Sequence, residues 1–555
     1  MTSMSVPASY SSFKAAAAIV LLCVIVSLPG FFTLPPIDRD EPRFTQATKQ
    51  MVASQNYVDI RFSDKPRYKK PAGIHWVQSV SVWISGYNTE APIWVYRIPS
   101  LMGLIICCLL LWRIASVFFE RRFVFASVAL FPLLLLSNVE VRLAKTDMVL
   151  LACILLTILP LARSWFTKNK PWDAFLFWSG LGACILIKGP IGPLLILLMT
   201  SSLSLWGRQV SWLKPLMNPI AILLAILFTM PWFVAIGFES NGEFYRLALG
   251  EDLFSKVKRA REGHGAPPGF YTALVFVTFW PVSAYLTGSV MQLKKLWQHS
   301  AFPFLLAWFL PFWILVELVP TKLPHYPYPV YPALLLFVVS CVLSAPINSS
   351  TKPTGFWRKS AHLFELATRL LLMSVPFSIG VGIVVVTYLL EGVIAWIPIF
   401  FSLMAMFAGA AALYSWQDKP RSLFFAGLSA SGLFFGFFQF GAPALSRLWI
   451  APRLVAQIQG HTECSQPLIF VHGYNEPSFV FLNNRPVYTL VEYRKKKTID
   501  ADCHFFVIEE RRAKDFPKLV ATEDRGSIVA NLEGFNLSTG RSLNFAVHRL
   551  ELSQK

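Results

Sequence analysis

Acidic and basic side chains are concentrated in residues 37–71, the segment "IDRDEPRFTQATKQMVASQNYVDIRFSDKPRYKKP". A carboxylate can act as a general base or support a developing positive charge, and lysine or arginine can bind phosphate through charge-assisted hydrogen bonds. The segment therefore predicts a site for an anionic ligand. The alternative is a helix cap followed by a solvated run of charges. The residues concerned are Asp40, Glu41, Arg43, Arg61, Lys65, Arg67, Tyr68, Lys69 and Lys70.

Three other segments carry polar residues that suit the same chemistry. Ionisable groups beside apolar runs are costly and usually face a cavity. The alternative for Lys322 is a lysine that reaches the membrane interface, and for the tyrosines an aromatic belt. The three groups are Lys256, Lys258, Arg259, Arg261 and His264; Arg142, Lys145 and Asp147; and Lys322, His325, Tyr326 and Tyr328.

The composition indicates that these residues belong to a polytopic α-helical membrane protein. Of 555 residues, 55% are hydrophobic and only 15% are charged, whereas about a quarter are charged in average proteins. Apolar runs of about 20 residues recur, and each can cross the hydrocarbon core as a helix. We expect about thirteen spans, near 14–34, 94–118, 123–139, 147–164, 173–188, 190–207, 215–238, 270–290, 301–319, 326–345, 370–391, 393–415 and 420–442.

Loop charges predict the orientation of these spans. With the N-terminus inside, most short inner loops are rich in lysine and arginine, as the positive-inside rule requires. The outer segments 35–93 and 239–269 are basic as well, which suggests a site for anionic groups such as a lipid phosphate. We expect the first apolar stretch to be retained, because it lacks a clear cleavage site. The segment "LIKGPIGP" (186–193) lacks the spacing of a phosphate loop, which argues against a nucleotide-driven pump.

Two regions outside the spans have predicted structures of their own. In the first outer segment, Phe44, Ala47, Met51 and Val52 recur at helical spacing after Pro42, which predicts a helix lying flat on the membrane. The tail, 446–555, alternates short apolar runs and predicts a small extracytoplasmic α/β domain after a transmembrane domain, 1–445. The runs include "PLIFV", "PSFVFLNN", "PVYTLVE", "HFFVIEE" and "SLNFAVHRL". Cys464 and Cys503 of this tail can form a disulfide there or stay reduced.

The motifs, taken together, resemble a known superfamily. "RDEPRF", "KKPAGIHW", "AKTDM" and "TKLPHYPYPVYP" occur in this order. They resemble the GT-C integral-membrane glycosyltransferases, closest to the bacterial aminoarabinose-to-lipid A transferase family, which is related to the protein O-mannosyltransferases. The resemblance extends over the whole length, including thirteen spans and a small outer C-terminal domain.

This resemblance implies sugar transfer from a polyprenyl-phosphate carrier to lipid A or another envelope acceptor at the periplasmic face of the bacterial inner membrane. It implies no nucleic-acid partner. Asp40, with Glu41 beside it, would be the catalytic acid and Asp147 the second acid. If the acceptor is a lipid A phosphate, Asp40 would mainly position groups. Substrate would bind to Arg43, Tyr68, Lys69, Lys70, Lys256, Arg259, Arg261, His264, Lys322, His325 and Tyr326.

One residue departs from the family pattern, and several alternatives stay open. The family usually carries a Glu before this Lys-Pro that can contribute to a divalent metal site, but Lys69 stands here, which argues against a metal. Aminoarabinose competes with galacturonic acid and other sugars, and lipid A competes with protein hydroxyls. A transporter would favour charges near the midplane and inverted repeats, which this sequence lacks. A non-catalytic scaffold would leave the basic outer segments unexplained.

Overall fold

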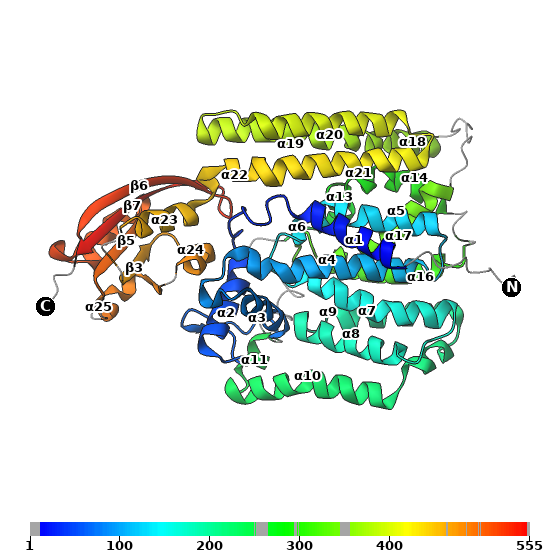
Figure 1. Cartoon of the computed structure of the whole chain (residues 1–555), viewed down its shortest axis with the longest axis horizontal. Coiled ribbons are helices and arrows are strands. Elements are labelled where there is room, and N and C mark those ends of the chain that lie inside the picture. Colours follow the sequence, from blue (N-terminus) through cyan, green and yellow to red (C-terminus); the bar gives the residue numbers. More distant parts are fainter. Residues whose placement is uncertain are drawn as a thin grey trace.

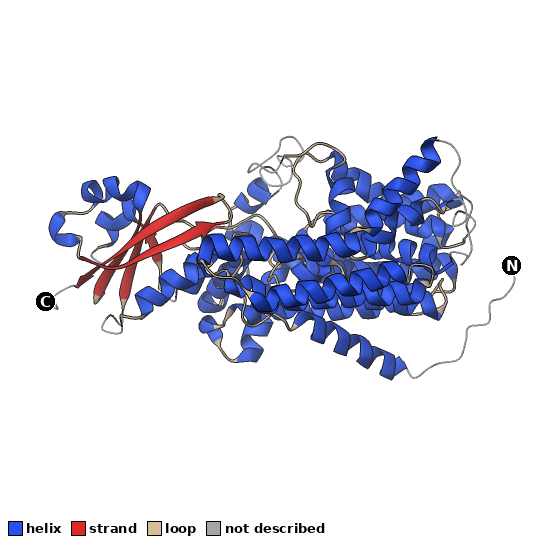
Figure 2. Ribbon diagram, turned by 90° about the horizontal axis from the view of Figure 1, so that it is seen from above, coloured by secondary structure: helices blue, strands red, loops and turns tan. Residues whose placement is uncertain are grey.

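The computed structural model describes residues 12–248, 250, 265–293, 297, 299–344, 356–461, 464, 466–483, 485–497, 499 and 501–551. A long helical bundle forms one end of the molecule and a β-sheet with short helices forms the other (Figures 1 and 2). The N-terminus lies at the bundle end and the C-terminus at the sheet end (Figure 1). The predicted helical membrane fold with a small C-terminal sheet region is confirmed.

Apolar helices long enough to cross a membrane make up much of the bundle. In the described part of the chain, six pass by length and hydropathy, or seven if one bent pair counts as a span. The chain is therefore a multi-pass membrane protein, while the number thirteen stays a prediction. The six are α4 (Ile93–Ala115), α7 (Asp147–Phe166), α10 (Pro219–Glu239), α19 (Leu371–Glu391), α20 (Trp396–Tyr414) and the stretch Lys419–Ala444, which contains α21 (Lys419–Gly436) and α22 (Ala442–Ala444).

Shorter helices complete the bundle around a shared apolar core. Buried residues from α4, α7, α16 and α17 pack together in its largest hydrophobic cluster. Helix α18 follows as a separate amphipathic segment. These helices are α1 (Ser12–Ser27), α8 (Asp173–Lys188), α9 (Ile191–Gly207), α16 (Phe302–Leu318), α17 (Tyr331–Ser344) and α18 (Phe356–Arg369).

Two of the expected spans are not continuous helices. The region 123–139 divides into α5 (Arg121–Leu130), a 3-10 turn and α6 (Leu135–Glu140). The region 270–290 bends by 117° between α13 (Phe270–Thr278) and the helical stretch Val282–Val290, which contains α14 (Leu286–Val290). Pro132 and Pro281 lie at these breaks. Proline has no N–H for the helical hydrogen-bond ladder, which explains why the helix is interrupted in both segments.

The first outer segment folds into two helices and a small hairpin. Helix α2 (Asp40–Ser54) is followed by β1 (Arg61–Phe62), β2 (Lys65–Pro66) and α3 (Gly73–Ser85). The helical prediction is correct, but its apolar face does not lie on lipid. Ala47 and Met51 are buried with Trp232 of α10 and Phe244 of α11 (Glu243–Tyr245) in one cluster. Helix α2 is therefore held rigidly against the bundle.

The C-terminal segment forms a five-stranded mixed sheet of order β4-β3-β5-β7-β6. Strands β3, β4 and β5 are parallel, and β7 pairs antiparallel with β5 and β6. A disulfide joins Cys464 to Cys503, as one of the two predictions had it. The elements are α23 (Ile450–Gln459), β3 (Pro467–His472), α24 (Pro477–Leu482), β4 (Val487–Thr489), α25 (Tyr493–Lys496), β5 (Cys503–Glu509), α26 (Phe516–Leu519), β6 (Ser527–Asn536) and β7 (Arg541–Glu551).

One apolar run of the tail forms a helix. The run "PSFVFLNN" contains α24. Pro477 begins this helix, where the missing N–H costs nothing. Apolar runs this short fit either structure, and the surroundings decide between them.

Candidate active site

A cavity of about 460 Å³ brings together residues that are far apart in the sequence. The wall includes the N-terminus of α2, residues 67–70 between β2 and α3, the start of α7 and the segment before α17. The cavity includes residues from three of the segments in which the sequence predicted a polar site. Its predicted members are Asp40, Glu41, Arg43, Lys69, Lys70, Asp147, His325 and Tyr326.

Asp40 is the accessible carboxylate at the beginning of α2. Its side chain is 52% exposed, and one oxygen lies 3.9 Å from Nη1 of Arg43. The first turn of a helix favours negative charge, so this position suits an ionised carboxylate. Asp40 can therefore reach a ligand in the cavity, with the arginine beside it.

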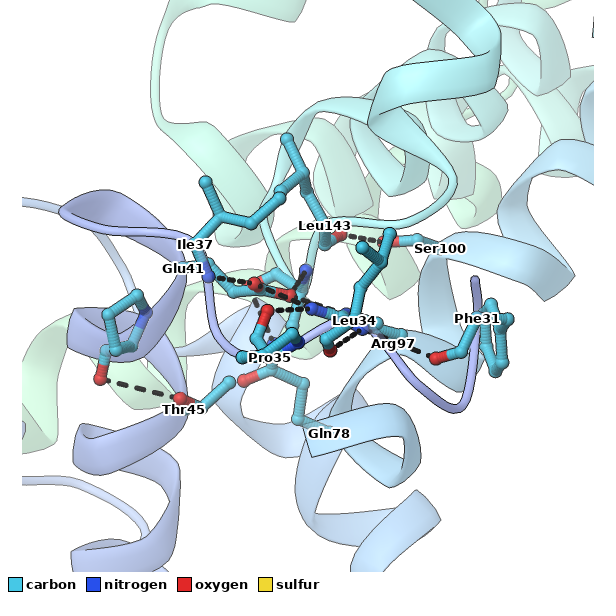
Figure 3. Close-up of polar contacts among 12 residues, drawn as sticks. Phe31, Leu34, Pro35, Ile37, Glu41, Thr45, Gln78, Arg97, Ser100 and Leu143 are labelled. Carbon is cyan, nitrogen blue, oxygen red and sulfur yellow. Dashed lines mark hydrogen bonds and ion pairs between the residues drawn. The ribbon is translucent and has the colours of Figure 1, made fainter. Parts of the chain in front are cut away.

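Glu41, by contrast, is completely buried. Its carboxylate accepts two hydrogen bonds from Arg97 of α4, at 2.8 and 3.0 Å, and two from the backbone N–H groups of Ile37 and Ala144, at 2.8 and 2.9 Å (Figure 3). Both side chains of the ion pair are 0% exposed. All four acceptor positions are used, so this geometry disfavours the predicted catalytic role for Glu41.

Arg97 extends the same network to the preceding loop. Its guanidinium donates to the carbonyl groups of Phe31, Leu34 and Pro35 (Figure 3). Arg97 thereby holds the loop that precedes Asp40, through these carbonyl groups, and the residue that follows Asp40, through Glu41. Adjacent residues of a helix point about 100° apart, which explains why neighbouring acids have such different surroundings.

A second charged cluster surrounds Asp147 at the start of α7. The Nζ atom of Lys188 lies 2.5 Å from one carboxylate oxygen of Asp147, and Nζ of Lys145 lies 3.8 Å from the other. Lys145 also pairs with Glu140 at 3.1 Å, and Nε2 of His325 lies 3.8 Å from Asp147. The lysines therefore compensate two buried acids and remain beside the cavity.

The protonation of this cluster follows from burial and charge. Burial raises the pKa of Glu140 to about 7, although Lys145 works against it. Burial alone would lower the pKa of Lys145, but Glu140 and Asp147 outweigh it and raise that pKa above its usual value. Burial also holds the pKa of His325 well below its usual value despite the attraction of Asp147. Lys145 is thus a cation and His325 a neutral imidazole near pH 7.

Glu140, Asp147 and His325 are also the one group in the described residues whose ligand atoms lie close enough to hold a metal ion. Two ammonium groups contact the same carboxylates, Lys145 at 3.1 Å from Glu140 and Lys188 at 2.5 Å from Asp147. A divalent cation placed there would be repelled by both lysines. The residues of this group therefore do not fit a metal ion.

An apolar cavity of about 530 Å³ adjoins the polar one. The two share six lining residues, and beyond these the second wall is almost entirely aliphatic and aromatic. A ligand with a charged head and a long hydrocarbon tail matches this pair of cavities. The shared residues are Lys69, Lys70, Asp147, Lys188, His325 and Tyr326.

Two predicted binding residues lie outside both cavities. The Tyr68 hydroxyl donates to Asp59 at 2.7 Å, and its ring packs against Phe244. The Nζ atom of Lys322 donates to the carbonyl groups of Val316 and Glu317 at the end of α16. Both predictions are therefore wrong: Tyr68 packs the fold, and Lys322 satisfies carbonyl groups that the helix end leaves open.

The remaining predicted basic residues, Lys256, Arg259, Arg261 and His264, lie outside the described residues. Sequence reasoning also missed some members of the polar cavity. Lys188 lies in "LIKGPIGP", where an ionisable residue between two apolar runs was an available signal. Ser538, in the turn between β6 and β7, carried no such signal. The missed residues include Arg39, Lys188, Thr321 and Ser538.

The sequence is similar to a mannosyltransferase family model and to curated arabinosyl transferases. A family model described as "Dolichyl-phosphate-mannose-protein mannosyltransferase" matches residues 69–234. The "Undecaprenyl phosphate-alpha-4-amino-4-deoxy-L-arabinose arabinosyl transferase 2" of Pseudomonas fluorescens is 26% identical over 334 residues, which cover 58% of this chain and 55% of that protein. The "Undecaprenyl phosphate-alpha-4-amino-4-deoxy-L-arabinose arabinosyl transferase" of Erwinia tasmaniensis is 23% identical over 309 residues, 54% of each protein. This chain thus spans about half the length of the curated relatives it matches.

Solved structures decide the fold. ArnT from Cupriavidus metallidurans aligns with 97% of this chain and 98% of its own length, at 16% identity, with a TM-score of 0.73 in the apo state and 0.71 with bound undecaprenyl phosphate. The chain has the ArnT fold. The alignment of this ArnT-like chain includes the C-terminal sheet as well as the bundle, because it covers nearly all residues. The resemblance to GT-C aminoarabinose transferases that the motifs predicted is confirmed.

Proposed function

We propose that this protein is a glycosyltransferase that transfers a sugar from a polyprenyl-phosphate carrier to an acceptor at the outer face of the membrane. The main support is the polar cavity that continues into an apolar one through shared lysines. The carrier has a phosphate head and a long isoprenoid tail, and this shape and charge match the two cavities. We infer that the donor is an undecaprenyl-phosphate sugar of the aminoarabinose type, because the relatives' names specify that donor.

The chemistry follows from charges that develop during transfer. The acceptor oxygen bonds to the anomeric carbon while the bond between that carbon and the phosphate oxygen breaks. The phosphate leaves with the electron pair, and Lys70 and Lys188 would stabilise its negative charge. Asp40 would take the proton of a hydroxyl acceptor or orient an acceptor that is already ionised. Asp147 would hold Lys188, which lies 2.5 Å away.

Lipid A is the acceptor that we favour, in the periplasmic leaflet of the bacterial inner membrane. We infer a cytoplasmic N-terminus from the loop charges, and a periplasmic C-terminal domain, 446–555, that follows the membrane domain, 1–445. A protein hydroxyl is the second candidate acceptor, because the matching family model over residues 69–234 describes protein mannosyltransferases. Arg43 and Arg67 at the cavity would favour an anionic acceptor such as a lipid phosphate.

Mass spectrometry of lipid A from a deletion strain carrying each variant tests the proposal. Asp40→Asn and Lys70→Ala should abolish the added sugar while the protein still reaches the membrane. Asp64→Asn and Lys65→Ala are matched controls, since both residues are exposed in the same outer segment and neither lines the described cavity. Modification that persists in the first two variants refutes the site, and a mass shift on envelope proteins instead of lipid A favours the second acceptor.

A further inference from the structure

The segment that leads into Asp40 is bonded to the C-terminal sheet region. Asp38 accepts a hydrogen bond from the backbone N–H of Ser478 at 2.9 Å and another from its hydroxyl at 2.5 Å. Ser478 is the second residue of α24, and the residue before that helix, Glu476, makes no side-chain cap. Asp38 therefore supplies from 440 residues away the acceptor that a helix start requires.

Arg39 makes a second bond to the same region. Its Nε atom lies 3.2 Å from an oxygen of Glu476, whose side chain is only 9% exposed. The other oxygen of Glu476 accepts from the side-chain amide of Asn536 in β6 at 2.9 Å. The sheet thus holds the Glu476 side chain in place independently of its contact with Arg39. Because Glu476 is held in one orientation, its ion pair with Arg39 has a defined geometry, which an ion pair between two mobile surface side chains lacks.

Apolar packing holds α24 in place beside α2. The ring of Phe481 lies 5.5 Å from that of Tyr96 in α4, and it is buried with Val82 and Ala144. Lys49 of α2 donates to the carbonyl groups of Phe481 and Asn483. Figure 1 shows α24 on the side of the sheet region that faces α2. The contact therefore combines buried apolar area with polar bonds at both ends of α24.

These contacts bear on the active site because Asp40 follows at once. Glu41 fixes the chain after Asp40 through Arg97, while Asp38 and Arg39 fix it before Asp40 through the C-terminal region. The Asp40 side chain itself is 52% exposed, and its ion pair with Arg43 is long, at 3.9 Å. Its position thus depends on its chain neighbours. The C-terminal region also adds Ser538 to the wall of the same cavity.

We propose that Glu476 and Ser478 are positioning residues for Asp40, so that the C-terminal region is a working part of the active site. This inference rests on the proposed function. Without the two bonds, residues 37–39 would no longer hold Asp40 at the distance from the sugar that transfer requires. A displacement of about 1 Å can cost on the order of 100-fold in rate. The carrier contacts at Lys70 and Lys188 lie on other segments and would remain.

The test compares Ser478→Ala with Ser527→Ala, an exposed serine of the same sheet, using undecaprenyl phosphate-aminoarabinose as donor and lipid A as acceptor. We expect Ser478→Ala to lower kcat about 10- to 100-fold with the donor KM changed less than about 3-fold. Ser478→Thr keeps the hydroxyl and should restore most of kcat. Hydrogen exchange of residues 35–44 should rise in Ser478→Ala and stay normal in Ser527→Ala.

Glu476→Gln gives an independent answer if Ser478→Ala does not fold, because the amide can keep the bond to Asn536 while the ion pair with Arg39 is lost. Unchanged kcat and exchange in a folded variant overturn the proposal. So does a donor KM that rises as much as kcat falls. Asp40→Asn distinguishes failure of the proposed function from failure of the positioning role. If this variant transfers sugar like the wild type, the proposed active site is wrong, regardless of the result for Ser478→Ala.

Discussion

The buried pair of Glu41 and Arg97 gives the strongest prediction about the architecture of the site. In Glu41→Gln, one side-chain oxygen can still accept from Nε of Arg97 and from the N–H of Ala144. The new amide nitrogen then faces two donors, Nη2 of Arg97 and the N–H of Ile37, which now lie 3.0 and 2.8 Å from an oxygen. An attractive carboxylate is thus replaced by a donor-to-donor contact in a site that excludes water.

The magnitude follows from the burial of both partners. Both side chains are 0% exposed, and breaking such a pair costs about 3–5 kcal/mol because a charge is left uncompensated. If this free energy is lost from the closed state of the segment, the locally open population around residues 31–41 rises about 10²- to 4 × 10³-fold. Replacing both residues with leucine would not rescue the site, since Arg97 also binds three carbonyl groups.

Hydrogen exchange with mass spectrometry measures this opening in peptides that contain Ile37 and Ala144. Both amides should exchange faster in Glu41→Gln by about the factor given above. Glu120→Gln is a control of the same chemistry, because Glu120 pairs with Arg122 at 3.3 Å while both side chains are more than half exposed. That change should cost less than about 1 kcal/mol. Equal exchange in Glu41→Gln and the wild type would refute the structural role assigned to Glu41.

Three other predictions concern the carrier, pH and the disulfide. Lys188→Met should weaken binding of undecaprenyl phosphate about 10-fold in a fluorescence titration, while Lys168→Met, an exposed lysine, should leave it unchanged; equal affinities would exclude Lys188 from the site. Burial raises the pKa of Asp38 to about 6, against hydrogen bonds from Ser478 that lower it. Folding therefore takes up a proton between about pH 4 and 6, and the free energy of unfolding should fall by at most about 3 kcal/mol as pH rises through that range. Thermal unfolding against pH should lose this slope in Asp38→Asn, whose Oδ1 can still accept from the N–H of Ser478 while its amide donates to the Ser478 hydroxyl oxygen; a persistent slope contradicts the assignment. Reducing the disulfide Cys464–Cys503, which closes a loop of 39 residues, should destabilise the sheet by about 4 kcal/mol and speed amide exchange in β3 and β5; unchanged exchange would show that the crosslink is dispensable.

Much of the candidate site could be predicted from residue types and membrane topology. Asp40, Lys70, Asp147 and His325 come from three predicted segments. The sequence predicted that all four face the same side of the membrane, and they line one cavity. That inference needs only the charge of each residue and the side of the membrane on which it lies. It does not need the packing of any helix. The general chemistry of the site was therefore available before the fold.

The roles of single residues depended on partners that the sequence does not reveal. Glu41 is adjacent to Asp40, but its role is set by Arg97, 56 residues away in α4. Tyr68 stands in the basic run, yet its hydroxyl bonds to Asp59. The apolar run at residues 477–482 forms a helix, and Asp38 accepts a hydrogen bond from the backbone N–H of its second residue. Such long-range contacts override local patterns, since the same short run fits several structures.

The adjoining polar and apolar cavities have a consequence for how this protein must be studied in solution. A substrate whose tail occupies the apolar cavity is dissolved in the lipid or micelle phase, so the concentration that the protein meets is a mole fraction of that phase. Adding detergent at fixed total donor dilutes the donor on that scale and lowers the rate, although its molarity is unchanged. Kinetic constants measured at different detergent levels become comparable only after conversion to surface units.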